Sequence, residues 1–158
     1  MTVIATGTAG DAEMAARIAM HRARRPPRWT VIEEPLQLAA ALAGAAHAEG
    51  VTLVDCLTLW LSNLMGDPDP ERIVQEVERL IAILPDLPGD HILVGNEVGF
   101  GIVPVNALAR RFADEAGVLH QRLAGICDRV ILMVAGLPLA VKGRDAGLLD
   151  AGLSGERP

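Results

Sequence analysis

The sequence predicts a three-layer α/β domain built around a mostly parallel β-sheet. Short apolar runs rich in Val and Ile alternate with segments of helical periodicity, an order typical of parallel strands connected by helices. With 158 residues, 51% of them apolar, the chain has the size of one domain with a sizeable core. Thr6, Asp55 and Glu97 each follow a predicted strand. Such sheets bind ligands beyond the carboxyl ends of their strands, so we expect one polar edge.

The first third of the chain predicts one strand and two helices. Residues 1–6 are a short apolar run that is typical of a buried strand. Residues 11–24 predict a helix that begins at an Asp or Gly and ends before two consecutive prolines. Residues 39–48 are rich in alanine and predict a second helix.

The middle of the chain predicts a buried strand and an amphipathic helix. Residues 51–55 form a continuous β-branched and apolar run that ends in a carboxylate, as in a parallel strand that delivers an acid to a site. Residues 70–84 predict a helix because apolar residues recur every three or four positions. The charged residues of this helix are expected on a solvated surface: Glu71, Arg72, Glu76, Glu78 and Arg79.

The last part of the chain predicts two strands separated by a long helix. Residues 91–94 and 130–135 have the composition of strands, and residues 106–126 that of a helix. We interpret residues 1–142 as a single α/β domain. Residues 143–158 are rich in Gly, Asp and Arg, which predicts a flexible tail.

Composition argues against several classes of function. The net charge of −6 disfavours a general nucleic-acid surface, which needs clustered Lys and Arg. Aromatic residues make up only 3% of the chain, so stacking platforms for single strands are not expected. No apolar stretch approaches the roughly 20 residues that cross a bilayer, and no signal peptide is recognisable, so we expect a cytoplasmic protein. Cys56 and Cys127 predict neither a disulfide framework nor a metal site, and both are expected to be buried thiols.

The segment 11–35 carries the clearest chemical signal. On a helix, Glu13, Arg17 and His21 share one face because they are four residues apart. A neutral imidazole can attack the α-phosphorus of a nucleotide when nearby cations neutralise the phosphate oxygens. His21 among arginines therefore predicts a nucleophile at a phosphate site. The alternative is an exposed helical histidine without a role, which the surrounding arginines make the weaker interpretation.

Three other residues have more than one interpretation. Asp55 is placed to hold Mg²⁺ directly or through water, or to cap the helix that follows. Glu97 follows a strand in the same way and is a candidate to orient a substrate hydroxyl or to accept its proton. Trp29 lies beside the arginines and either covers a ligand or packs at the rim of the site.

Together these residues resemble one family, the bifunctional adenosylcobinamide kinases and adenosylcobinamide-phosphate guanylyltransferases of cobalamin biosynthesis. The resemblance covers nearly the whole chain up to Lys142. It includes Ala-Thr at 5–6, Asp-Ala-Glu-Met at 11–14, Arg-Ile at 17–18, His21, Arg-Pro at 25–26, Trp29, Glu-Glu-Pro at 33–35, Val-Asp-Cys-Leu-Thr-Leu-Trp at 54–60 and Asn-Leu at 63–64. It continues with Asn-Glu-Val-Gly at 96–99, Gly-Ile-Val-Pro at 101–104, Ala-Arg-Arg-Phe at 109–112, Gln-Arg-Leu-Ala at 121–124 and Gly-Leu-Pro-Leu at 136–139.

The resemblance implies a fold, a reaction and a set of site residues. The fold would be a P-loop NTPase-like α/β domain assembled as a homotrimer. The enzyme would phosphorylate the aminopropanol hydroxyl of adenosylcobinamide with ATP or GTP, with Mg²⁺ as cofactor. It would then transfer GMP from GTP to the adenosylcobinamide phosphate to give adenosylcobinamide-GDP. The implied catalytic residues are His21 as GMP acceptor, Asp55 and Glu97. The implied nucleotide-binding residues are Thr6, Gly7, Thr8, Arg22, Ala23, Arg24, Arg25, Glu33 and Asp55.

One element of the family pattern does not occur in this sequence. The phosphate loop G-x-x-x-x-G-K-[ST], with the strand before it and the helix after it, has no match among the 158 residues. That loop supplies backbone N–H donors and a lysine to the triphosphate. Two hypotheses follow: a family enzyme whose sequence here begins late, which we favour, or a non-catalytic remnant that binds a nucleotide or corrinoid or associates with complete subunits.

Overall fold

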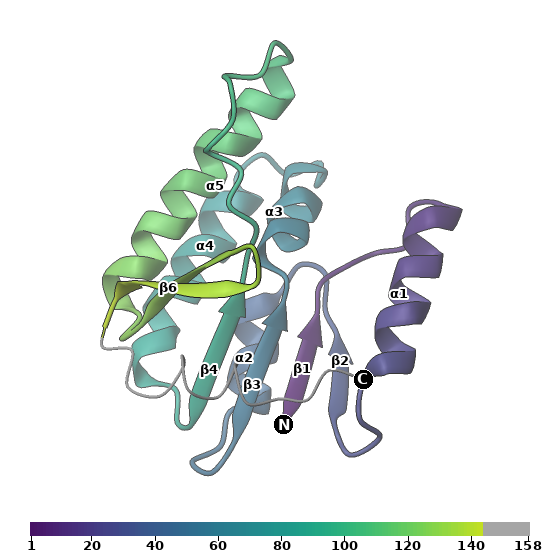
Figure 1. The fold of residues 1–158 in the computed structure, drawn as a ribbon, viewed down its shortest axis with the longest axis vertical. Helices are drawn as coiled ribbons and strands as arrows, with labels where there is room; N and C mark the ends of the chain where they lie inside the picture. Colours follow the sequence, from purple (N-terminus) through teal and green to yellow (C-terminus); the bar gives the residue numbers. More distant parts are fainter. Residues whose placement is uncertain (144–158) are drawn as a thin grey trace. The chain divides into compact units, whose positions relative to one another are not determined.

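The computed structural model of the protein describes residues 1–143. They form two compact units, of which the first covers Met1–Leu119 and the second begins at His120. Figure 1 traces both units, a sheet with helices in the first and a β-hairpin in the second. Of the predicted tail 143–158, all but the first residue lies outside the described residues.

The first unit is organised by a four-stranded parallel sheet with the strand order β2-β1-β3-β4. Its strands are β1 (Thr2–Ala5), β2 (Thr30–Glu33), β3 (Val51–Asp55) and β4 (Asp90–Val94). Ala5 pairs with both Glu33 and Asp55, so three carboxyl ends finish at one level. The predicted parallel sheet is confirmed. Strand β2 has no counterpart among the predicted elements.

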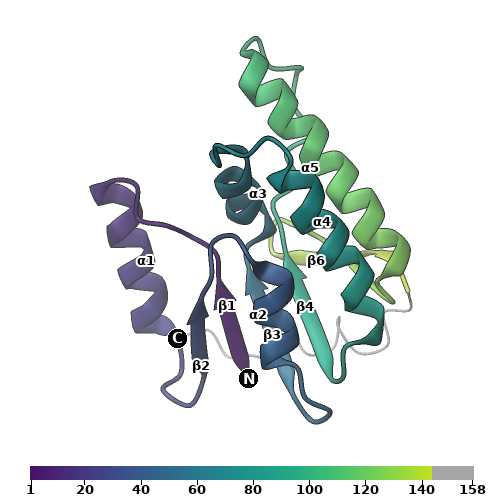
Figure 2. The same cartoon turned by 180° about the vertical axis from the view of Figure 1, so that it is seen from behind.

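Three helices cover one face of this sheet and enclose the core. They are α2 (Leu38–Ala45), α3 (Leu57–Met65) and α4 (Arg72–Ile83), which lie behind the sheet in Figure 1 and in front of it in Figure 2. A short 3-10 helix, η1 (Leu84–Asp86), follows α4. The largest buried apolar side chains of this unit are Ile4, Leu38, Leu42, Trp60, Leu61, Leu64 and Leu80. Each such side chain stabilises the fold by about 1.5–3 kcal/mol through removal of apolar surface from water.

Helix α1 (Ala12–Arg24) differs from these helices because none of its residues is buried. It begins where Asp11 accepts a hydrogen bond from the backbone N–H of Met14 at 2.7 Å. It ends at Arg25, whose extended backbone is the conformation favoured before a proline. The helix predicted over residues 11–24 is confirmed. The ion pairs that join this helix region to the sheet lie at its C-terminal end, where Arg22 pairs with Glu33 and Arg25 with Asp55.

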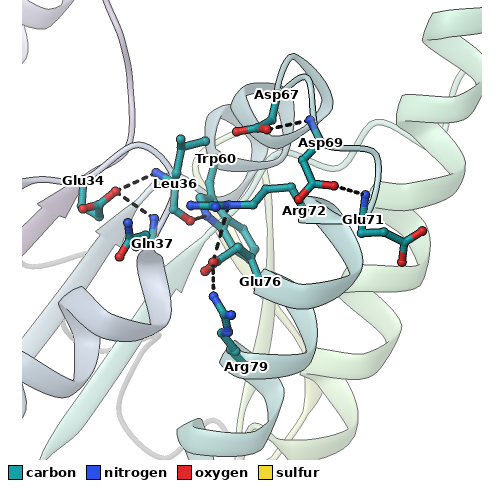
Figure 3. Close-up of polar contacts among 10 residues, drawn as sticks. All are labelled: Glu34, Leu36, Gln37, Trp60, Asp67, Asp69, Glu71, Arg72, Glu76 and Arg79. Carbon is teal, nitrogen blue, oxygen red and sulfur yellow. Dashed lines mark hydrogen bonds and ion pairs between the residues drawn. The ribbon is translucent and has the colours of Figure 1, made fainter.

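The expectation that all charged residues of α4 face solvent is wrong for Glu76. This side chain is only 1% exposed, and Oε1 accepts a hydrogen bond from Nη1 of Arg79 at 2.6 Å. The same oxygen lies 3.6 Å from Nε of Arg72 (Figure 3). Glu76 falls within the buried stripe because it is three residues from Ile73 and four from Leu80, which are both in the core. Its carboxylate is therefore neutralised by arginines instead of water.

The second unit contains an antiparallel hairpin of β5 (Val130–Val134) and β6 (Leu137–Lys142). The strand predicted over residues 130–135 is confirmed, but β6 was not expected. Ala135 and Gly136 form the two-residue turn, with φ of 52° and 78° respectively. Positive φ at both positions is what a tight hairpin turn of type I′ requires. Helix α5 (Ala107–Ile126) precedes the hairpin, and Nζ of Lys142 donates to the carbonyls of Ala124 and Gly125.

Within the described part of the chain, no helix has both the length and the apolar character needed to span a membrane. The two cysteines are free thiols, Cys56 buried and Cys127 partly buried.

Candidate functional site

The carboxyl ends of β1 and β3 are joined by Thr6, which is fully buried. Its hydroxyl donates to the carbonyl of Cys56 at 2.7 Å and accepts from the N–H of Cys56 at 3.0 Å. The hydroxyl of this predicted nucleotide-binding residue is thus occupied within the protein. The chain then turns at Gly7, where an added Cβ would lie 3.2 Å from Cδ1 of Leu59, and reaches the exposed Thr8.

His21 and Arg25 come together with Asp55 at this edge, although Asp55 follows Arg25 by 30 residues in the sequence. Nδ1 of His21 lies 3.9 Å from Oδ2 of Asp55, and Nη2 of Arg25 lies 3.4 Å from the same oxygen. The side chain of His21 is 62% exposed, whereas that of Arg25 is 14% exposed. The histidine therefore remains accessible to a ligand while the arginine is held against the carboxylate.

Asp55 does not cap the helix that follows it, which removes one of its two interpretations. The residue at the N-cap of α3 is Cys56, whose Sγ accepts from the N–H of Leu59 at 3.5 Å. The carboxylate of Asp55 is left to face the side chains of His21 and Arg25. Burial of Cys56 at this cap also agrees with its predicted role as a small buried residue.

A pocket of about 280 Å³ lies beside this cluster, near the lower end of the range of small-ligand sites. Its lining comprises Arg22, Arg25, Pro26, Pro27, Trp29, Val31 and Glu33. Arg22 and Glu33 form an ion pair across it. Trp29 lines the pocket and is partly exposed, as a ligand-covering residue would be. The combination of two guanidinium groups, one carboxylate and apolar walls suits a nucleotide.

The two neighbouring glutamates after β2 have different surroundings. Glu33 lines the pocket, whereas Glu34 accepts hydrogen bonds from the N–H groups of Leu36 and Gln37, both at 2.8 Å. Figure 3 shows Glu34 at the start of α2, with Nε1 of Trp60 bonded to the carbonyl of Leu36 nearby. Glu33 thus faces the pocket, where it pairs with Arg22, and Glu34 stabilises the turn.

The other predicted residues of the basic helix are solvent-exposed. Ala23 and Arg24 lie on the last turn of α1. Arg17 forms an ion pair with Glu13 at 2.8 Å and does not line the pocket. The cations that line the pocket are Arg22 and Arg25.

Glu97 lies at the same edge of the sheet but beyond a different strand. It follows β4, which is separated from β1 by β3. Its Oε1 accepts from the N–H of Gly99 at 2.6 Å, and an added Cβ at Gly99 would lie 2.8 Å from that oxygen. A side chain at position 99 would therefore have to displace the carboxylate from this place.

Asn63 in α3 is a residue whose contribution the sequence reasoning missed. Its Nδ2 donates to the carbonyls of Thr6 at 2.7 Å and Pro35 at 3.1 Å. Its Oδ1 lies 3.4 Å from the hydroxyl of Thr8, which donates to it. In the sequence, the one side-chain amide on a mostly apolar helix was the available signal.

The described residues contain no group of three or more His, Cys, Asp or Glu side chains that could hold a metal ion. Asp55 provides oxygen at this edge, which is the ligand type that Mg²⁺ prefers. One carboxylate fits a Mg²⁺ ion that is bound mainly by the phosphates of its nucleotide and by water.

Comparisons with known proteins agree on one family. Residues 1–141 match the family model described as cobinamide kinase / cobinamide phosphate guanyltransferase. The chain is 55% identical over 143 residues to the bifunctional adenosylcobalamin biosynthesis protein CobP of Pseudomonas aeruginosa, covering 90% of this chain and 83% of that protein. It is 38% identical over 152 residues to the bifunctional adenosylcobalamin biosynthesis protein CobU of Escherichia coli, and 39% identical to that of Salmonella typhimurium. Both alignments cover 88% of this chain and 84% of the relative.

Proposed function

Because the chain belongs to the cobinamide kinase / cobinamide phosphate guanyltransferase family of cobalamin biosynthesis, we propose that it catalyses both reactions through the edge described above. The first reaction transfers a phosphoryl group from ATP or GTP to the hydroxyl of adenosylcobinamide. The second transfers GMP from GTP to the adenosylcobinamide phosphate, giving adenosylcobinamide-GDP. The observation that carries the proposal is the position of His21, exposed, beside Asp55 and next to an arginine-lined pocket.

In the guanylyl step, Nε2 of His21 attacks the α-phosphorus of GTP. An N–P bond forms, and the bond from the α-phosphorus to the bridging oxygen breaks as pyrophosphate leaves with the electron pair. The phosphate of the corrinoid then attacks the same phosphorus, the N–P bond breaks, and the free imidazole is regenerated. Splitting the transfer in this way lets one site serve a donor and an acceptor in turn.

Asp55 is proposed to orient the imidazole for this attack. An Nδ1–H that faces the carboxylate leaves the lone pair on Nε2, and the negative charge stabilises the ring as it becomes cationic. The separation of 3.9 Å is longer than a hydrogen bond, as is common before a substrate is bound. We also propose that Asp55 supplies a ligand to the Mg²⁺ ion of the nucleotide, which would neutralise phosphate charge.

The pocket is proposed to receive the nucleotide of the guanylyl step. Arg22 and Arg25 are placed to pair with phosphate oxygens, and Trp29 with the neighbouring prolines forms an apolar wall for the base or ribose. Glu33 offers a carboxylate that can accept two N–H groups from guanine but meets no such pair on adenine. We propose that the nucleotide is bordered by the backbone of Thr6, Gly7 and Thr8. The outer turn of α1 contributes Ala23 and Arg24.

For the kinase step we propose that Glu97 accepts the proton of the corrinoid hydroxyl as the hydroxyl oxygen attacks the γ-phosphorus, while the bond from that phosphorus to the bridging oxygen breaks and the nucleoside diphosphate leaves with the electron pair. Its carboxylate is oriented by the N–H of Gly99. Among the described residues, Arg22 and Arg25 are the cations that we propose at the phosphates, because both line the pocket. Residues 1–142 are proposed to act as one nucleotide-binding domain.

We propose that the protein is a homotrimer located in the cytoplasm. The side chains of Ile102 and Val105 are each 97% exposed, and such apolar exposure is common at protein interfaces. Light scattering should then give three times the chain mass of 16.7 kDa.

Two labelled forms of GTP test the proposed reactions together. With α-labelled GTP the protein should retain label after acid-free denaturation and release it in acid, because phosphoramidates are acid-labile. With γ-labelled GTP the label should instead move to adenosylcobinamide and not remain on the protein. A folded chain that takes no α-label would favour the non-catalytic remnant.

A further inference from the structure

We propose that Asn63 is a positioning residue for the guanylyl site, an inference that rests on the proposed function. Its amide links two loops that leave neighbouring strands of the sheet. Nδ2 donates to the carbonyl of Thr6, which follows β1, and to that of Pro35, which lies two residues after β2. Oδ1 accepts from the hydroxyl of Thr8 in the same first loop.

An asparagine side chain suits this place better than any other residue of its size. The amide nitrogen has two N–H donors, and here both are used by backbone carbonyls. An aspartate at position 63 would place a negative oxygen against those carbonyls, and an alanine would leave them to water. Because Asn63 is half-buried on α3, whose Leu61 and Leu64 are in the core, its position is fixed by the fold.

The two linked loops carry the parts of the proposed site that face each other. The loop through Thr6 and Thr8 leads directly into α1, the helix of His21, which has no buried residue of its own. The loop through Pro35 begins just after Glu33, the partner of Arg22. A fixed spacing between these loops sets the position of the chain that enters the N-terminal end of α1, and the same helix carries His21 and Arg22 near its C-terminal end, beside the pocket. Loss of the link should therefore misplace His21 without removing any group that contacts the nucleotide.

The test compares Asn63→Ala and Asn63→Asp with Ser62→Ala, a change at the exposed neighbour on the same helix. Each protein is mixed with α-labelled GTP under single-turnover conditions, and both the rate constant and the amplitude of labelling are measured. A displacement of about 1 Å can slow a reaction about 100-fold. We expect rate constants that are about 10- to 100-fold lower for both Asn63 variants, with the GTP concentration for half-maximal rate little changed. Ser62→Ala should match the wild type.

The same proteins are examined by hydrogen exchange at two backbone amides beside the link. The N–H of Thr6 donates to the carbonyl of Asp55, and that of Glu34 donates to the carbonyl of Ala5. Both amide protons should exchange faster in the Asn63 variants than in the wild type. In Ser62→Ala they should exchange at the wild-type rate. A role in stability alone would lower the labelling amplitude and leave the rate constant as in the wild type.

The outcomes separate this inference from the proposed function. A normal rate constant in Asn63→Asp overturns the positioning role, because the aspartate lacks both donors. Absence of label on the wild type contradicts the proposed function instead. In that case, faster hydrogen exchange at the amides of Thr6 and Glu34 in the Asn63 variants supports the link that Asn63 makes between the two loops. Exchange at the wild-type rate overturns that link.

Discussion

Nδ1 of His21 lies 3.9 Å from Oδ2 of Asp55, which joins the exposed helix α1 to the end of the central strand β3. Nη2 of Arg25 lies 3.4 Å from the same carboxylate oxygen, so Asp55 contacts both the imidazole of His21 and the guanidinium of Arg25. Asp55 reaches this position because it pairs with Ala5, the last residue of β1, and because the chain leaves β1 toward α1. The proposed nucleophile is thus supported by a rigid sheet although its own helix has no buried residue.

Replacing Asp55 by asparagine should slow the guanylylation of His21. The amide keeps the size of the side chain but cannot stabilise the cationic ring or fix its tautomer. We expect a loss of about 100-fold or more in the single-turnover rate constant with α-labelled GTP. Asp86→Asn, a change at an exposed carboxylate of η1, is the control. A rate constant within about twofold of the wild type would remove Asp55 from the reaction.

Glu33 and Glu34 should separate binding from stability. Glu33→Gln removes the pocket carboxylate that pairs with Arg22, so the KM for GTP should rise about 10-fold with little change in Tm. Glu34→Gln weakens the acceptor for two backbone N–H groups, which should destabilise the fold by about 1 kcal/mol. Steady-state kinetics and thermal unfolding measure the two effects. If Glu34→Gln raised the KM for GTP and Glu33→Gln lowered the stability instead, Glu34 and not Glu33 would be the carboxylate that contacts the nucleotide.

Glu76 should be important for stability despite its place on an amphipathic surface helix. Glu76→Ala removes the carboxylate that lies 3.6 Å from the buried Nε of Arg72 and leaves the charge of that arginine uncompensated. Breaking a buried pair in this way costs about 3–5 kcal/mol, and the exposure of Arg79 places the expected loss near 3 kcal/mol. Urea unfolding gives the free energy, with the exposed neighbour Gln75→Ala as control. Equal stability of the two variants would mean that water replaces the carboxylate.

Cys127 should react slowly with alkylating reagents at mildly alkaline pH. Burial raises the pKa of its thiol, the positive charge of Lys142 opposes that rise, and Asp128 adds to it. A raised pKa means less thiolate at a given pH, so alkylation should increase at higher pH than for an exposed thiol. Lys142→Met should slow the alkylation of Cys127 further because it removes the positive charge. Lys142→Arg keeps the charge and should not slow the reaction. Peptide mass spectrometry resolves Cys127 from Cys56, and faster reaction in Lys142→Met would contradict the assigned cause.

The sequence predicted the elements with strong periodicity and missed those that depend on distant partners. Helix α1 and strand β3 were recognisable from a cap, a proline stop and a β-branched run. Strand β2 has only four residues and depends on pairing with β1, which no local pattern reveals. The burial of Glu76 was missed for a similar reason, because its position among apolar neighbours was read as the polar side of the helix.

The candidate site was predictable in its residue types but not in its contacts. Thr6, Asp55 and Glu97 were expected at one edge because parallel strands end together, whereas His21 was proposed from its place among arginines and Glu33 from the family resemblance. The sequence left open whether Asp55 caps the helix that follows it, and in the structure Cys56 is the N-cap of α3 instead. The link made by Asn63 joins segments far apart in the chain, so it required the three-dimensional structure.

The most direct measurement is the identification of the residue that carries GMP. The wild type, His21→Ala and His47→Ala are incubated with α-labelled GTP, and the acid-labile label is located by peptide mapping. His47 is an exposed histidine between α2 and β3 and serves as the control. We predict label on the peptide of His21 in the wild type and in His47→Ala, and none in His21→Ala. Label that persists in a folded His21→Ala protein would contradict the proposed role of His21.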